Sequence, residues 1–305
     1  MSDPLTPTSD TGRGDDHALA RDLAAEAGRR LLELRARGGE PDVLRKAGDR
    51  LSHEFLTAAL ADRRPGDVVL SEEGADDPAR LTASRVWIVD PLDGTREFGE
   101  PGRTDWAVHV ALWEPSDTSD SGDLTAGAVA LPAQGQVLST APGEPARCSI
   151  GPLITGTMLH RAGGGAQSDG ADGDEEAGGV GGTARTQGRD ARVRIVVSRT
   201  RAPRFVRDIP GLIDAELVPL GSAGAKVAAV VCGAADAYVH GGGFYEWDTA
   251  APVAVARAAG FHASRIDGSP LLYNQADLLV PDILVCRPAL AGALLEAIRE
   301  VTNAS

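Results

Sequence analysis

The 305-residue sequence is poor in cysteine and in long apolar runs, and each shortage argues against a class of protein. Its three cysteines, Cys148, Cys232 and Cys286, are far apart and outside any Cys-x-x-Cys spacing, which argues against a disulfide framework or a zinc site. We expect all three to be buried as small apolar residues. Because no run of about 18 apolar residues occurs, a membrane span is not expected.

Basic residues are also scarce, since 30 Lys and Arg face 44 Asp and Glu and the formal net charge is −14. Nucleic-acid surfaces need clusters of Lys and Arg, so a nucleic-acid polymer is not expected as a partner. A small anionic substrate stays possible, because metal ions in one cleft reverse the local potential. The first residues lack the basic and apolar regions of a secretion signal, and we therefore expect a cytoplasmic protein.

Helical and strand patterns alternate along the chain, which predicts an α/β layered fold of two subdomains. Apolar residues at helical spacing predict a first helix from His17 to about Arg37. We expect residues 1–16 to form a disordered tail and the Gly-rich, acidic residues 161–187 to form a disordered insertion. The two subdomains then span residues 17–155 and 191–305.

The segment VWIVDPLDGTREF, Val86 to Phe98, delivers an apolar strand directly into two carboxylates, a glycine and a threonine. Pro91 stiffens the turn that presents Asp90 and Asp93, and Gly94 lets the backbone approach a ligand closely. If a helix begins directly after this glycine, its free N–H groups face an anion. The segment therefore predicts metal-binding carboxylates beside a phosphate-binding turn.

Two further acids fit the same interpretation, because Glu72 ends the preceding strand and Asp248 opens a helix much later in the chain. Hard cations such as Mg²⁺ take oxygen ligands and are commonly held by carboxylates together with substrate phosphate. The alternatives are solvated loop acids for the strand ends and simple helix caps for Asp248 and Asp49. If a metal binds, Asp49 could accept a proton relayed through the Thr95 hydroxyl, and the chemistry would be hydrolysis of a phosphate monoester.

The stretches WIVDPLDGT (Trp87 to Thr95) and WDTAAP (Trp247 to Pro252), with LSEE upstream, resemble the signatures of the Mg²⁺-dependent, lithium-sensitive inositol monophosphatase superfamily. The resemblance covers the chain from about Leu19 to its end, except for the insertion. It implies a layered α-β-α-β-α sandwich, often as a homodimer. It also implies about two or three Mg²⁺ ions per site, held by Glu72, Asp90, the carbonyl of Leu92, Asp93 and Asp248. The catalytic residues that it implies are Asp49 and Thr95, which activate water, and Glu72.

Within the superfamily, the stretches DPLDGTREF, GDRLSHEF, VVSR, GSAGAK and EWDTAAP look most like the CysQ-type 3'(2'),5'-bisphosphate nucleotidases. Those enzymes remove the 3'-phosphate of adenosine 3',5'-bisphosphate, a by-product of sulfate assimilation. Lys226 could meet a second phosphate as a point charge, or it could snorkel from a small-residue helix. Arg201 stands where the nucleotidases often have His, and Arg suits a doubly phosphorylated ligand. The substrate-binding residues predicted in this way are Gly94, Thr95, Ser198, Arg199, Arg201, Ser222, Lys226 and Asp248.

An inositol monophosphatase or fructose 1,6-bisphosphatase activity on the same metal centre is the alternative within this family. A metal-binding protein without turnover is the alternative outside it. A binding protein would need neither a hydroxyl at Thr95 beside the carboxylates nor a rigid turn at Pro91, which favours the enzyme. We therefore predict a 3'(2'),5'-bisphosphate nucleotidase that acts on a small phosphorylated substrate with Mg²⁺.

Overall fold

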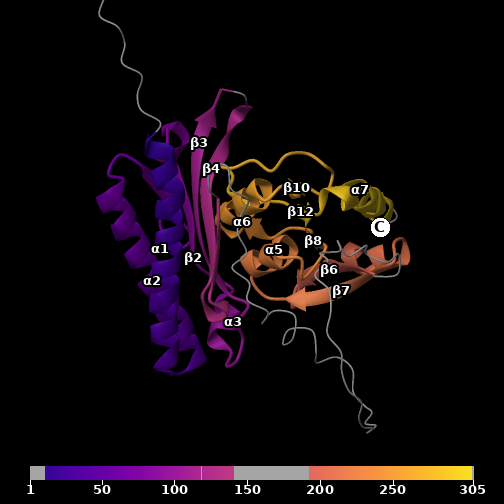
Figure 1. The fold of residues 1–305 in the computed structure, drawn as a ribbon, viewed down its shortest axis with the longest axis horizontal. Helices are drawn as coiled ribbons and strands as arrows, with labels where there is room; N and C mark the ends of the chain where they lie inside the picture. Colours follow the sequence, from indigo (N-terminus) through magenta and orange to yellow (C-terminus); the bar gives the residue numbers. More distant parts are fainter. Residues whose placement is uncertain (1–10, 118, 141–191, 304–305) are drawn as a thin grey trace, which may run out of the picture.

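Five layers of helix and sheet alternate in the computed structural model, which describes residues 11–117, 119–140 and 192–303 (Figure 1). The outer layer consists of helices α1 (Thr11–Ala36) and α2 (Pro41–Arg63), which cover one face of the first sheet. This sheet has five strands in the order β1 (Val68–Ser71), β2 (Val86–Asp93), β3 (Ala107–Ser116), β4 (Ser119–Leu131) and β5 (Gln136–Ser139). Only β1 and β2 run parallel in it.

Helices α5 (Ala223–Val231) and α6 (Glu246–Ala258) form the central layer between the first sheet and a second one. The second sheet has the order β10 (His262–Ser264), β12 (Ile283–Cys286), β8 (Ala237–His240), β6 (Val193–Ser198) and β7 (Ala215–Leu220). Helix α7 (Pro288–Asn303) packs on its outer face together with η3 and η4. This order of layers confirms the predicted α-β-α-β-α sandwich. The short elements are η1 (Pro78–Thr82), α3 (Thr95–Gly99), η2 (Pro132–Gln134), η3 (Phe205–Arg207), η4 (Ile209–Gly211), β9 (Phe244–Tyr245) and β11 (Leu279–Val280).

Strand β3 explains why the first sheet is covered on both faces. Successive side chains of a strand point to opposite faces, and in β3 both sets are mainly apolar, with His109 as a buried polar exception. Val108 and Val110 join the apolar cluster with α1 and α2, whereas Ala107 and Ala111 join the cluster with α5 and α6. The small alanines let the central helices come close to the sheet, and this approach brings the C-terminal half of the chain onto the ends of β2.

The first helix begins earlier than predicted. It starts at Thr11 instead of His17. The prediction of a tail over residues 1–16 is therefore wrong for residues 11–16, which belong to the helix. Asp16 is buried there and lies 2.7 Å from Arg64 and 2.8 Å from Arg85. These long-range ion pairs hold the first turns of α1 in place, and a window of local composition cannot detect them. The predicted insertion, residues 161–187, lies outside the described residues.

The second helix begins at Pro41, well before the start that a cap at Asp49 would have set, with Glu40 as the preceding residue. Asp49 consequently lies inside α2, so its interpretation as a helix cap is wrong. Among the cysteines, Cys286 is buried and free as predicted, whereas Cys232 is disulfide-bonded, against the prediction. Distance along the sequence does not tell which cysteines the fold brings together. Of the helices described, none is long and apolar enough to cross a membrane.

Candidate active site

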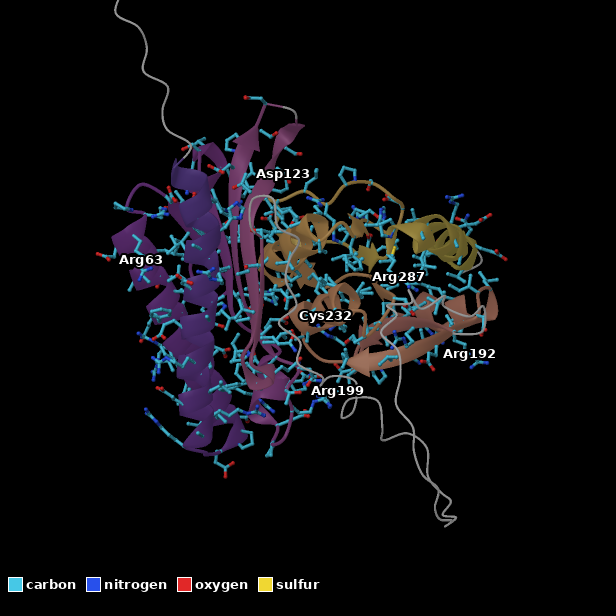
Figure 2. All side chains as sticks on the ribbon, viewed as in Figure 1. Arg63, Asp123, Arg192, Arg199, Cys232 and Arg287 are labelled. Atoms are coloured by element: carbon cyan, nitrogen blue, oxygen red, sulfur yellow. The ribbon has the colours of Figure 1, made fainter. Side chains whose placement is uncertain are left out.

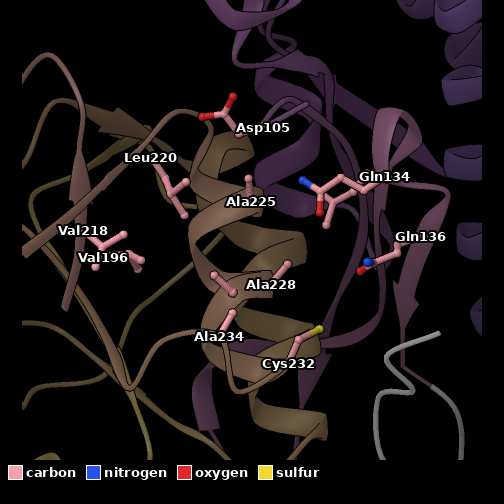
Figure 3. Close-up of a pocket in the computed structure, with 12 residues that line it drawn as sticks. Asp105, Gln134, Gln136, Val196, Val218, Leu220, Ala225, Ala228, Cys232 and Ala234 are labelled. Carbon is pink, nitrogen blue, oxygen red and sulfur yellow. The ribbon is translucent and has the colours of Figure 1, made fainter. Parts of the chain in front are cut away.

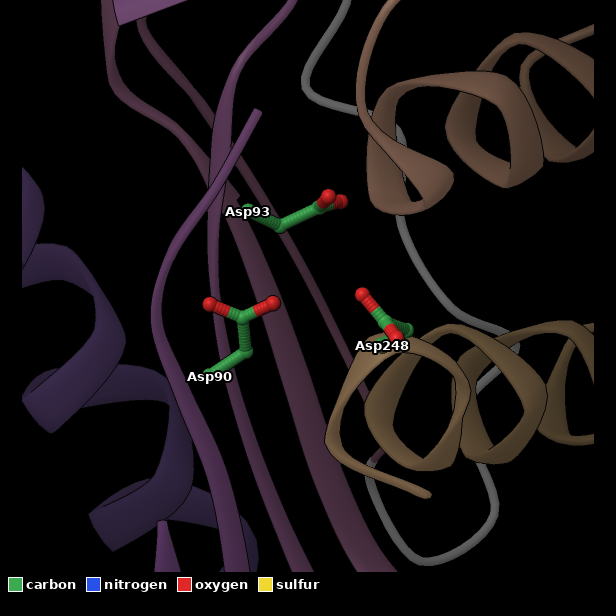
Figure 4. Close-up of side chains that lie close together, drawn as sticks. All are labelled: Asp90, Asp93 and Asp248. Carbon is green, nitrogen blue, oxygen red and sulfur yellow. The ribbon is translucent and has the colours of Figure 1, made fainter. Parts of the chain in front are cut away.

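Three carboxylates from two distant parts of the chain meet at the end of the first sheet. Asp90 and Asp93 project from β2, and Asp248 projects toward them from the first turn of α6 (Figure 4). One carboxylate oxygen of each lies within 4.8 Å of the others. Asp90 and Asp93 are 1% and 8% exposed, so their charges are largely removed from water. Such a set is suited to a cation, because like charges at this separation repel strongly in a buried site unless a cation binds or a proton is taken up.

The backbone of the DPLD motif departs from regular strand geometry where the acids are presented. The pairing of β2 with β3 changes register between Asp90 and Asp93, around the proline that lacks an N–H donor. Asp90 accepts a hydrogen bond from the N–H of Leu92 at 2.9 Å, and this contact fixes the Asp90 side chain at the irregular part of the strand. Gly94 then adopts a φ of +83°, and α3 begins at the next residue. The predicted turn and helix start are confirmed, but the strand continues past Asp90 to Asp93.

Asp248 caps its helix and also faces the other two acids. It lies in the first turn of α6, and its carboxylate accepts a hydrogen bond from the N–H of Tyr245 at 2.7 Å. This contact caps the helix and fixes the direction of the side chain. The same carboxylate belongs to the cluster with Asp90 and Asp93, so capping and metal binding are compatible here.

Burial and mutual repulsion raise the pKa values of three carboxylates at this site. Burial, and then the neighbouring charges of Glu72 and Asp93, raise the pKa of Asp90 well above its ordinary value. Burial and the charge of Asp93 raise the pKa of Asp248 to about 6. At the rim, partial burial and the charge of Asp248 raise the pKa of Glu72 to about 7. The donors are all oxygen atoms, as Mg²⁺ prefers, and the uncompensated charge fits a divalent cation.

Asp93 differs from its neighbours because the protein itself supplies partners for its charge. Burial acts to raise the pKa of Asp93, but the attraction of His109, Lys226 and the Ser222 hydroxyl holds it below the ordinary value. Ser222 donates to its Oδ2, and the N–H of Gly224 donates to the same oxygen at 2.8 Å. His109, which the sequence analysis did not single out, lies 3.2 Å from this oxygen. A histidine at an inward-facing position of the alternating strand DWAVHVALWE was the available signal.

A hydroxyl and a half-buried acid lie beside the cluster. The Thr95 hydroxyl is 2.9 Å from the carbonyl oxygen of Leu92 and 3.3 Å from a carboxylate oxygen of Asp49. Burial and the charge of Glu73 raise the pKa of Asp49 to about 6, against a smaller opposing effect of the Thr95 hydrogen bond. A carboxylate tuned toward neutral pH and joined to a hydroxyl is suited to general-base chemistry.

One open pocket of about 810 Å³ collects nearly all residues predicted for the site. It adds Arg96, Glu97 and His240, which were not predicted. Asp49 is the one predicted residue outside the lining, and it reaches the pocket through Thr95. The predicted residues in the lining are Glu72, Asp90, Leu92, Asp93, Gly94, Thr95, Ser198, Arg199, Arg201, Ser222, Lys226 and Asp248.

Two of the predicted basic residues are already engaged with other groups. Lys226 is buried, and its ammonium donates to the carbonyl oxygens of Gly221 at 2.7 Å and Ser222 at 2.6 Å. Its buried position excludes the snorkelling interpretation. Arg199 pairs with Glu97 at 2.7 Å and lies where the C-terminal half meets the first sheet (Figure 2). Arg201 is exposed on the pocket wall, and no ion pair engages its guanidinium among the described residues.

A second pocket, of about 580 Å³, lies between α5 and the strands on either side of it (Figure 3). Most of its lining is apolar, from residues such as Val196, Val218 and Ala228. Asp105 is the one acidic residue among its described lining residues. This composition lacks the convergent charged groups of the first pocket, so we assign the chemistry to the first.

Known proteins of one family resemble this chain over most of its length. The sequence model of the inositol monophosphatase family matches residues 18–303 of this chain. The chain is 47% identical over 291 residues to a Mycobacterium leprae protein named 3'-phosphoadenosine 5'-phosphate phosphatase, covering 94% of each. It is 30% identical over 266 residues to the 3'(2'),5'-bisphosphate nucleotidase CysQ of Escherichia coli K12, covering 83% of this chain and 91% of that protein.

Solved structures of the same family have the same fold. The structure of CysQ from Bacteroides thetaiotaomicron aligns with a TM-score of 0.68 and 26% identity, over 90% of this chain and 97% of that one. A staphylococcal inositol monophosphatase bound to inositol monophosphate aligns with a TM-score of 0.66, over 94% and 95% of the two chains. Its identity of 20% supports likeness of fold alone.

Proposed function

Because the chain belongs to the inositol monophosphatase family, whose members are metal-dependent phosphate monoester hydrolases, we propose that it removes the 3'-phosphate of adenosine 3',5'-bisphosphate. The observation that carries the chemistry is the cluster of Asp90, Asp93 and Asp248 beside the Thr95 and Asp49 pair. The names of the relatives with 47% and 30% identity support the choice of substrate.

The cation in this proposal is Mg²⁺, with about two or three ions per site, since all donors are oxygen atoms. The residues that would hold it are Glu72, Asp90, the Leu92 carbonyl, Asp93 and Asp248. When bound, such ions withdraw charge from the phosphoryl group and make water more acidic.

The protein's own groups then have distinct tasks in our proposal. Asp49 accepts the proton of the attacking water through the Thr95 hydroxyl, and its pKa of about 6 keeps it ionised at neutral pH. The turn at Gly94 presents backbone N–H groups to the phosphate that is removed. Arg201, exposed on the opposite wall, meets the second phosphate. The cytoplasmic location and the homodimer stay predictions.

Phosphate release from three substrates tests this function. Adenosine 3',5'-bisphosphate, inositol 1-phosphate and fructose 1,6-bisphosphate are assayed side by side with Mg²⁺ and after exhaustive treatment with EDTA. We expect the highest kcat/KM for the nucleotide, complete loss after chelation and recovery on addition of Mg²⁺. A preference for inositol 1-phosphate would contradict the substrate, and full activity after chelation would contradict the metal centre.

A further inference from the structure

His109 occupies the interior of the site without being one of its acids. It lies on β3 directly opposite Asp90 of β2, and it is fully buried. Its strand neighbours on the same face, Ala107 and Ala111, pack in the apolar cluster with α5 and α6. The imidazole therefore points away from α1 and α2 and into the junction between the sheet and the central helices.

Each ring nitrogen faces a different segment that carries a carboxylate of the cluster. Nδ1 lies 3.2 Å from the carbonyl oxygen of Trp247, the residue directly before Asp248. A carbonyl only accepts, so Nδ1 carries the proton of this hydrogen bond. Nε2 lies 3.2 Å from Oδ2 of Asp93, without the alignment of a hydrogen bond. One rigid ring thus spans the gap between β2 and the start of α6.

The third side of the ring is closed by α5. A Cβ atom on Gly224 would lie 2.2 Å from His109 Nε2, so only glycine lets the helix approach this closely. The N–H of Gly224 also donates to Asp93 Oδ2 at 2.8 Å. The ring has no room to shift, and the oxygen that it faces is held from two directions.

We propose that His109 is a positioning residue that sets the distance between Asp93 and Asp248, and with it the affinity of the site for divalent cations. The proposal rests on the metal centre of the proposed function and is independent of the substrate. His109 contacts the segments that hold the acids, and it is not part of the pocket lining. Outer partners of metal ligands typically change metal affinity or activity by about 10- to 100-fold when they are removed.

The test is calorimetric titration of the full chain with Mg²⁺, and in parallel with Mn²⁺, in the absence of substrate. His109→Phe keeps an aromatic ring but removes both nitrogens, and His109→Gln restores one N–H and one carbonyl oxygen. His262→Phe is the matched control, because His262 is a half-buried histidine of the second sheet whose side chain, within the described part of the chain, hydrogen-bonds Ser264 alone. Circular dichroism and thermal melting establish that each variant is folded.

We expect His109→Phe to weaken Mg²⁺ binding by about 10- to 100-fold, His109→Gln to recover part of that loss and His262→Phe to change nothing. Phosphatase activity of His109→Phe should rise again at high Mg²⁺ concentration, which a general loss of folding would not allow. Wild-type Mg²⁺ affinity in either folded His109 variant would overturn the inference while leaving the metal centre intact. Absence of Mg²⁺ binding in the wild-type protein would overturn the metal centre and the inference together.

Discussion

The hydroxyl of Thr95 lies between the carbonyl oxygen of Leu92, 2.9 Å away, and a carboxylate oxygen of Asp49, 3.3 Å away. A hydroxyl has one proton, so it donates to one of these acceptors at a time and keeps its lone pairs for a further donor. Asp49 comes from the interior of α2 and Thr95 from the start of α3. The hydroxyl therefore connects the cleft to a half-buried acid, which is the geometry that the proposed proton transfer requires.

Removing the acid of this path should slow the chemical step and leave metal binding intact. We expect Asp49→Asn to lower kcat by about 10²- to 10⁴-fold, the range for general-base catalysis. Thr95→Ala should have a similar effect, and Thr95→Ser, which keeps the hydroxyl, should retain most of the activity. Steady-state kinetics and Mg²⁺ titration of the same preparations are the measurements. A large loss of Mg²⁺ affinity in Asp49→Asn would mean that Asp49 acts as a ligand and not as a base.

The repulsion among the buried acids predicts how stability depends on pH in the metal-free protein. The pKa of Asp248 is raised to about 6 from an ordinary 3.8, and that of Asp90 is also raised well above its ordinary value. Groups with raised pKa values stabilise the folded state while they stay protonated. Their contribution is complete below about pH 4 and is lost as the pH rises through about 6.

Mg²⁺ should therefore stabilise the protein more at high pH than at low pH. Thermal melting in EDTA and in Mg²⁺ from pH 5 to pH 8 measures the difference in Tm, and we expect this difference to grow with pH. Asp90→Asn removes one of the repelling charges, so its metal-free Tm at pH 7.5 should exceed that of the wild type although its activity is lost. A difference in Tm that is constant across this range would contradict the electrostatic account.

Arg199 joins two parts of the chain and should act mainly on stability. It pairs with Glu97 of α3 at 2.7 Å and with Glu100 at 2.8 Å, and its side chain is 28% exposed. We expect Arg199→Ala to lower the free energy of unfolding by about 1–3 kcal/mol, because it leaves the buried Glu97 without its partner. Arg192→Ala is the control, since its pair with Asp214 is exposed and should contribute about 0–1 kcal/mol. Urea denaturation of both variants compares them, and equal small losses would contradict this structural role.

The carboxylate cluster could be predicted from the sequence because its members come in short motifs with rigid geometry. A proline, a glycine and an apolar strand fix the positions of Asp90 and Asp93 locally, and Asp248 is fixed by the helix that it caps. The Thr95 contact with Asp49 could be named only through the family resemblance, since the local pattern suggested a helix cap at Asp49. Helix α2 in fact begins at Pro41 and places this acid in its interior.

The partners of the cluster could not be predicted from the sequence, because they depend on how the layers pack. His109 contacts Asp93 and the Trp247 carbonyl. The sequence of its strand showed only an alternation of apolar residues, which does not indicate these partners. Lys226 shows the same limit, since a lysine after a Gly-Ser loop suggested a phosphate contact and gave no sign of its partners within the loop. In the fold its ammonium donates to two carbonyl oxygens of that same loop.

These contacts change what Lys226 is expected to do. Its ammonium is buried, and burial lowers its pKa to about 8 in spite of the nearby charges of Asp93 and Glu97. It fixes the loop from which Ser222 and Gly224 donate to Asp93. We therefore expect Lys226→Ala to reduce the activity toward mono- and bisphosphate substrates by the same factor. Unequal factors, with the larger loss for the bisphosphate, would restore Lys226 as a contact of the second phosphate.

Selection of a bisphosphate should then depend on Arg201, which is exposed on the pocket wall with no ion pair among the described residues. Inositol 1-phosphate needs only the metal centre, whereas adenosine 3',5'-bisphosphate carries a second dianion that requires a cation. We expect Arg201→Ala to lower kcat/KM for the nucleotide by about 10- to 100-fold, the equivalent of one charge-assisted hydrogen bond. The kcat/KM for inositol 1-phosphate should change by only a few-fold. Arg207→Ala is the control, because Arg207 is exposed but lies outside the lining. Equal losses on both substrates in Arg201→Ala would show that this arginine does not select the second phosphate.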